Sequence, residues 1–94
     1  MRSRYSAFAV GDPAYLLDTW HADTRPAALE LDPRVRWTGL EIVRTSGGRA
    51  FDAEGTVEFR AHSVRAGAAA AQHEVSRFVR DGGRWRYLDG VVRP

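Results

Sequence analysis

The stretch QHEVSRFVRDGGRWRYLDGVV, residues 72–92, predicts two antiparallel strands joined by a tight turn. In its first half, Glu74, Ser76 and Phe78 alternate with other residues, which is the period-two pattern of a β-strand. The Asp-Gly-Gly at 81–83 suits a short hairpin turn, because glycine readily adopts the positive φ that such turns need. This stretch therefore predicts an antiparallel sheet as the main element of the fold.

The neighbouring segments extend the sheet on both sides. After the turn, we expect the last strand to place Trp85, Tyr87 and Asp89 on one face. Upstream, small and apolar residues alternate with polar ones over 53–62, which predicts a half-buried strand with one solvent face. The alanine-rich segment 66–71 is too short to form a stable helix alone, so we expect a loose hairpin connection there.

A further strand begins near residue 35 and bends. Trp37 belongs to one alternating phase, whereas Leu40 and Ile42 continue in the opposite phase, as expected if Gly39 marks a β-bulge. Ser-Gly-Gly at 46–48 then indicates a turn. The sequence thus predicts four strands, the first of them bent.

Two helices are expected before the strands. The first has an apolar face at helical spacing, formed by Met1, Tyr5, Phe8 and Ala9. Gly-Asp-Pro at 11–13 ends this helix and begins the next, because Gly suits a C′ position, Asp an N-cap and Pro the first helical position. We expect the second helix to run to about Trp20, and residues 21–34 to form a connector.

Composition favours a single domain over residues 1–94. There is no cysteine, so this sequence offers no disulfide and no thiolate zinc site, and we expect neither metal nor cofactor in it. Its 14 basic residues are all arginine, but 12 acidic residues are interleaved with them, and nucleic-acid binding is not expected. No segment approaches the roughly 18 continuous apolar residues of a membrane span, so we expect a cytoplasmic location.

Several motifs in order resemble one family, the bacterial YchJ-type proteins. These motifs are MRSRYSAF at 1–8, YLLDTWHADTRP at 15–26, RWTGLEIV at 36–43, GTVEF at 55–59, HEVSRFVRDGGRW at 73–85 and YLDG at 87–90. The resemblance implies the α+β fold of a nuclear transport factor 2-like domain. In that fold, N-terminal helices pack on a curved four-stranded antiparallel sheet and form a cone.

The resemblance also concerns partners. In such proteins, MRSRYSAF usually follows a cysteine-rich, zinc-binding SEC-C segment, which this sequence lacks. A role beside the ribosome or the protein-export machinery is therefore implied only through that missing module. We also expect a homodimer formed through the outer sheet face, because Val75 and Val79 would otherwise be exposed there.

Fold alone does not select a function, so the hypotheses rest on side chains that could face the inside of the cone. The candidate pocket residues are Tyr15, Trp20, His21, Arg25, Trp37, Glu74, Ser76, Trp85 and Tyr87. The three tryptophans also suit a packed core, and His21 also suits a hydrogen bond to a carbonyl at the helix end. Arg25 also suits a structural role in which it fastens the connector to Asp18, Asp23 or Glu74.

We expect a non-catalytic binding or interaction domain with a small aromatic pocket. The alternative is a small-molecule lyase, isomerase or hydrolase in which His21 or Glu74 acts as acid or base, since burial tunes such groups for proton transfer.

Overall fold

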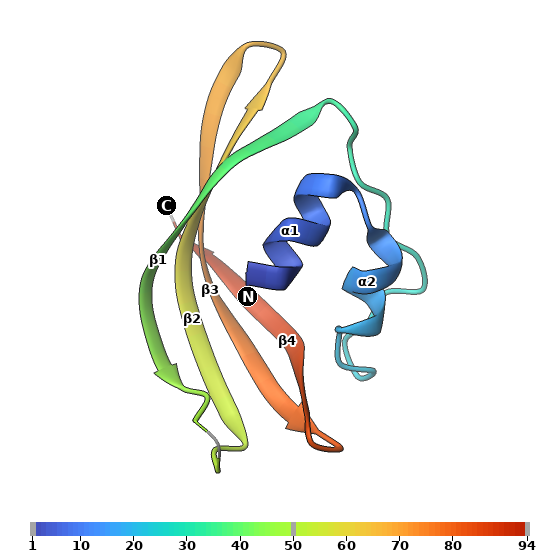
Figure 1. The fold of residues 1–94 in the computed structure, drawn as a ribbon, viewed down its shortest axis with the longest axis vertical. Helices are drawn as coiled ribbons and strands as arrows, with labels where there is room; N and C mark the ends of the chain where they lie inside the picture. Colours follow the sequence, from blue (N-terminus) through green and yellow to red (C-terminus); the bar gives the residue numbers. More distant parts are fainter. Residues whose placement is uncertain (1, 50, 94) are drawn as a thin grey trace.

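A computed structural model describes residues 2–49 and 51–93 of the chain. The elements in order are α1 (Arg2–Val10), α2 (Pro13–Asp18), β1 (Val35–Gly47), β2 (Glu54–Arg65), β3 (Ala68–Asp81) and β4 (Arg84–Arg93). The four strands form one antiparallel sheet in the order β1-β2-β3-β4. Figure 1 shows the sheet curving around α1, with both helices on its hollow side. The predicted α+β fold is therefore confirmed.

The turn between the helices has the helix-ending and helix-capping residues that the sequence predicted. Gly11 has a φ of 75°, and the side chain of Asp12 accepts a hydrogen bond of 3.1 Å from the backbone N–H of Tyr15. Pro13 is the first residue of α2, where its missing N–H costs nothing. The helix ends at Asp18 rather than Trp20, because Thr19 is already its C-cap.

Each helix buries little of its surface. In α1, the buried residues are Arg4 and Ala7, and in α2 only Leu16 is buried. Met1, assigned to the apolar face of the first helix, lies outside the described residues. Together with Phe59 and Ala61 of β2, the buried apolar residues of the described chain form a small core.

Strand β1 bends at two positions in its pairing with β2. The register shifts between Trp37 and Gly39, which confirms the predicted bulge, and shifts again between Ile42 and Arg44, which was not predicted. Each bulge adds one residue to β1 and increases its local twist. Before the strand, residues 21–34 contain no helix and no strand of the sheet, as expected for a connector.

The expected loose connection over 66–71 is wrong. Ala66 and Gly67 alone form the turn, with φ angles of 52° and 78°, and β3 begins at Ala68. The alanines continue the ladder, for example in the pair of Ala69 with Val64. Backbone pairing with β2 thus decides the conformation of a segment whose side chains favour helix.

The last hairpin corrects one further expectation. Gly82 and Gly83 form the predicted tight turn. Beyond it, the register shifts so that Tyr87 pairs with Phe78 but Asp89 pairs with Arg77. Asp89 therefore faces away from Tyr87 and accepts two hydrogen bonds from Arg77 on the outer face. The expectation that it shares a face with Trp85 and Tyr87 is wrong, because a bulge reverses the alternation.

The segment after α2 closes the exposed edge of β4. The backbone N–H of His21 donates to the carbonyl of Tyr87 at 2.7 Å, and the N–H of Tyr87 donates to the carbonyl of Thr19 at 2.8 Å. Trp20 and Tyr87 form an isolated parallel bridge between these bonds. The end of α2 is thereby fixed against the last strand, and the segment after it borders the space between the helices and the sheet.

Candidate functional site

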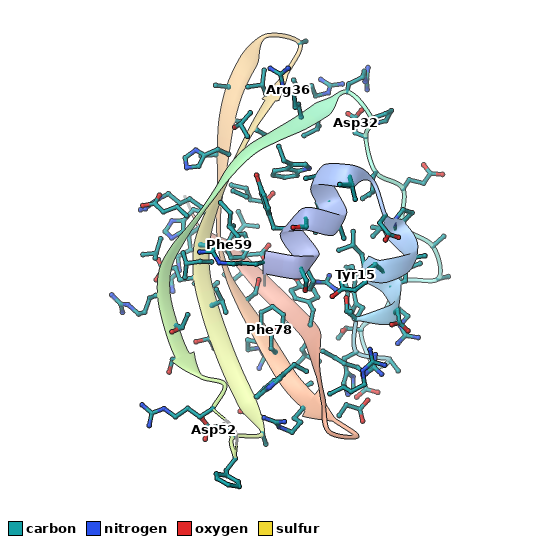
Figure 2. The ribbon with its side chains drawn as sticks, in the orientation of Figure 1. Tyr15, Asp32, Arg36, Asp52, Phe59 and Phe78 are labelled. Carbon is teal, nitrogen blue, oxygen red and sulfur yellow. The ribbon has the colours of Figure 1, made fainter. Side chains whose placement is uncertain are left out.

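A cavity of about 200 Å³ lies between α1, the segment after α2 and the inner face of the sheet. Its aromatic lining residues are Tyr5, Phe8, Trp20, Trp37, Phe59 and Tyr87, and the remaining ones are Arg4, Ala61, Gln72, Glu74 and Ser76. The walls are thus mainly apolar rings, with a few polar groups from α1 and β3. Figure 2 shows Phe59 against the inner side of the sheet and Tyr15 on α2, away from it.

Arg4 is the charged group that α1 brings to the cavity. Arg4 is only 5% exposed, and its Nη1 donates to the carbonyl of Leu16 at 2.9 Å and to Oγ1 of Thr19 at 2.6 Å. The guanidinium carbon lies 4.6 Å from the ring centroid of Tyr87 and 5.3 Å from that of Trp20. Burial lowers the pKa of Arg4 from its ordinary value. The side chain both ties α1 to the end of α2 and presents a positive charge.

Glu74 lies on the inner face of β3 within a polar row. Ser76 donates its hydroxyl to Oε2 of Glu74 at 2.5 Å, and Nε2 of Gln72 donates to Oε1 at 3.2 Å. These residues share a face because they occupy alternate positions of the strand. On β4, Gly90 lies beneath the carboxylate, at a point where a Cβ atom would stand 2.5 Å from Oε2. The missing side chain of Gly90 leaves the room that Glu74 occupies.

Tyr87 joins the polar and aromatic parts of the lining. Its ring packs edge-on against Trp20, with 5.0 Å between centroids, and against Phe78, with 5.8 Å. Burial, and secondly the nearby charge of Glu74, raise the pKa of Tyr87 to about 12. Its phenol is therefore protonated at neutral pH and is available as a hydrogen-bond donor.

The other end of the aromatic lining is formed by Trp37. The centroid of its ring lies 6.1 Å from that of Tyr5 and 6.0 Å from that of Phe8, both on α1. These tilted and edge-on contacts are the favoured geometries for aromatic pairs. The helix is thus held against β1 by rings that also line the cavity.

Five of the nine candidate pocket residues line this cavity, namely Trp20, Trp37, Glu74, Ser76 and Tyr87. They come from the segment after α2, from β1, from β3 and from β4. The expected inward cluster around Glu74 is thereby brought together with two of the tryptophans.

The other four candidates lie elsewhere. Tyr15 is 36% exposed on α2, and Trp85 lies under the guanidinium of Arg80, 4.5 Å from its carbon. His21 approaches Asp23 and Asp81 on the far side of the bridge to Tyr87.

Arg25 instead donates from Nε and Nη2 to the carbonyl of Trp20, at 3.1 and 2.8 Å. Because Trp20 turns its ring into the cavity, the following residue, His21, projects away from it. The two candidates at the helix end therefore do not meet Glu74 or Tyr87.

Sequence reasoning missed two polar lining residues, Arg4 and Gln72. Arg4 lies four residues before Phe8 and so shares its helical face, which was the available signal. Gln72 precedes Glu74 by two strand positions and so shares its sheet face. Among residues 2–49 and 51–93, no group of three His, Cys, Asp or Glu side chains is arranged to hold a metal ion.

Comparison with known proteins identifies one family and related proteins of that family. Residues 1–90 match the family described as YchJ, middle NTF2-like domain. A UPF0225 protein of Streptomyces coelicolor is 60% identical over 90 residues, which cover 96% of this chain and 69% of that protein. A UPF0225 protein of Chromobacterium violaceum is 54% identical over 95 residues, covering 98% of this chain and 70% of that protein.

Two solved structures share the fold. A SEC-C motif containing protein from Rhodopseudomonas palustris matches all of this chain and 76% of its own, with a TM-score of 0.83 and 29% identity. One from Psychrobacter arcticus matches all of this chain and 59% of its own, with a TM-score of 0.74 and 29% identity. Each of these relatives is longer than the part matched. None of the helices in the described ranges is long and apolar enough to cross a membrane.

Proposed function

The chain belongs to the family of YchJ middle NTF2-like domains, and on this premise we propose that it is a non-catalytic module that binds one small molecule. The observation that carries the proposal is the cavity of about 200 Å³ between α1 and the sheet. An engineered protein cavity of about 150 Å³ binds benzene. A cavity of this size therefore accommodates a molecule with a single ring and a small substituent.

The lining supports a binding role. Ligand pockets combine apolar and aromatic walls with a few polar groups that fix orientation. Here the walls are six aromatic rings, and the polar groups are on Arg4, Gln72, Glu74, Ser76 and Tyr87. Binding would bury the ring of the ligand against the aromatic wall and orient its substituent toward these groups.

The alternative of an acid–base enzyme has less support. His21 lies outside the cavity beside Asp23 and Asp81, which argues against it as a base acting there. Glu74 does line the cavity, but both of its carboxylate oxygens already accept hydrogen bonds, from Ser76 and Gln72. These bonds occupy an acceptor position on each oxygen and fix the carboxylate on β3. Glu74 nevertheless remains the residue on which the enzyme alternative would depend.

The binding proposal is tested by titrating the protein with benzamide, a neutral one-ring probe. The readout is the set of three tryptophan indole N–H signals in NMR spectra. We expect the signals of Trp20 and Trp37 to shift, since both line the cavity, and that of Trp85 to stay in place as an internal control.

Two variants complete this test. Ala61→Leu fills the cavity from β2 and should abolish the shifts, whereas Ala69→Leu, on an exposed position of β3, should leave them unchanged. Shifts that persist in Ala61→Leu, or that are as large for Trp85 as for the other two, would contradict binding in this cavity.

A further inference from the structure

We propose that the ligand of this cavity is a small monocarboxylic acid with one ring, whose carboxylate pairs with Arg4. The inference rests on the proposed binding function and specifies the chemical class of the ligand. It follows from the charge and the free donors of Arg4, and from the position of Glu74 in the same cavity.

No carboxylate of the described residues forms a salt bridge with the buried guanidinium of Arg4, and the charge of Glu74, in the same cavity, acts on it only from a greater distance. Arg4 is 5% exposed, yet its hydrogen bonds go to a backbone carbonyl and a threonine hydroxyl, both neutral. More exposed arginines of the same chain do have acids, as in the pairs of Arg77 with Asp89 and Arg65 with Asp32. Because buried charges are normally paired, an anionic group of a ligand would bind most favourably in this cavity beside the guanidinium of Arg4.

The geometry of Arg4 leaves one edge of the guanidinium for a ligand. Both of its hydrogen bonds use Nη1. No hydrogen bond is formed by Nε or Nη2 of Arg4 within the described residues, and since every fully buried side-chain nitrogen and oxygen there has a partner, these two groups keep some accessible surface; Arg4 itself lines the cavity. This edge carries two parallel N–H donors, the arrangement that binds a carboxylate through both of its oxygens.

The rings of Trp20 and Tyr87 fix the guanidinium in place for this contact. Both lie within cation–π distance of Arg4, which holds its plane while its edge remains open. An already ordered arginine loses less side-chain entropy when it binds an anion. The site is therefore preorganised for an acidic group.

Glu74 sets the limit on ligand charge. Its carboxylate belongs to the same lining but is held on β3 by Ser76 and Gln72. A second negative group on the ligand would meet this like charge in a partly desolvated space, where repulsion is strong. The cavity thus favours one carboxylate over two.

The experiment compares benzoate with benzamide, which has nearly the same shape but no charge, at neutral pH. Affinities are taken from the indole shifts of Trp20 and Trp37. We expect benzoate to bind about tenfold more tightly or better, because charge-assisted hydrogen bonds are roughly twice as strong as neutral ones. Terephthalate, with a second carboxylate, should bind more weakly than benzoate.

Arg4→Met should remove the preference for benzoate while benzamide still binds. Arg80→Met is the matched control, since Arg80 also stacks on a tryptophan and bonds backbone carbonyls, but outside this cavity. It should keep the wild-type preference. Should Arg4→Met not fold, the comparison of the two probes on the wild-type protein decides alone.

The outcomes separate the two proposals. Benzamide binding with no preference for benzoate would overturn the pairing with Arg4 and leave the binding function standing. A benzoate preference that survives in folded Arg4→Met would also overturn it. If neither probe shifts Trp20 and Trp37, both proposals fail.

Discussion

Replacing Gly90 by alanine should destabilise the protein through Glu74. A Cβ atom at Gly90 would stand 2.5 Å from Oε2 and 2.6 Å from Cδ of Glu74, closer than such atoms approach in proteins. The backbone of Gly90 does not have a positive φ, so alanine adds no backbone strain. The carboxylate must therefore move away, and its hydrogen bond from Ser76 is lost.

The size of the effect follows from two opposing contributions. Ser76 is 1% exposed, and a buried hydroxyl left without its partner costs about 1 to 3 kcal/mol. Replacing a strand glycine by alanine contributes about 0.5 to 1 kcal/mol in the other direction, since the unfolded chain loses freedom. The difference between these two ranges is a loss of about 0 to 2.5 kcal/mol in the free energy of unfolding, and we expect Gly90→Ala to fall near its middle.

Urea denaturation of four proteins measures this coupling, namely wild type, Gly90→Ala, Glu74→Ala and the double variant. In the Glu74→Ala background the clash is absent, so Gly90→Ala should stabilise the protein by about 0.5 to 1 kcal/mol. Gly39→Ala is the control, because Gly39 also lies in a strand without positive φ but has open space around its Cα. Equal costs of Gly90→Ala in both backgrounds would refute the reasoning.

Two further predictions concern pH and assembly. The pKa of Asp32 is lowered from 3.8 to about 2, first by the backbone N–H of Arg34 and then by its side chain. The ionised carboxylate therefore stabilises the folded protein above about pH 4, and this contribution is lost as the pH falls toward 2. In melting temperatures measured at a series of acidic pH values, Asp32→Asn should lose less stability between pH 4 and pH 2 than the wild type. An equal loss in both proteins would contradict this. The homodimer expected through the outer sheet face stays a prediction, and Val75→Lys, beside the 65% exposed Val91, should yield monomers in analytical ultracentrifugation. A monomeric wild-type protein at high concentration would exclude that dimer.

The fold was predictable because local signals and periodicity agreed. Gly-Asp-Pro at 11–13 marked the helix boundary, and alternation identified the strands. The errors lie where the pairing of strands overrides these signals. The alanines at 68–71 form part of a strand because they pair with β2. Asp89 lies on the other face than expected because of a bulge that the sequence does not indicate.

The candidate site was predictable only in part. Residues on strands, such as Glu74 and Ser76, were placed by alternation, which fixes the face of each side chain. The side chains at the end of α2 were not, because the bridge between Trp20 and Tyr87 sets their directions through contacts distant in sequence. Arg4 was missed because an arginine in a short helix is usually exposed, and only the tertiary structure shows that it is buried.

The bridge that joins residues 19–21 to Tyr87 also bears on how the chain folds during synthesis. Helices of 9 and 6 residues are too short to be stable in water by themselves, since isolated helices need roughly 12 to 15 residues. Their partner Tyr87 belongs to β4, which is synthesised after both helices and after the other three strands of the sheet. The helical segments must therefore wait until β4 has been synthesised, and such long-range closure is slow. During that interval, the inner face of the growing sheet is open to solvent and to chaperones.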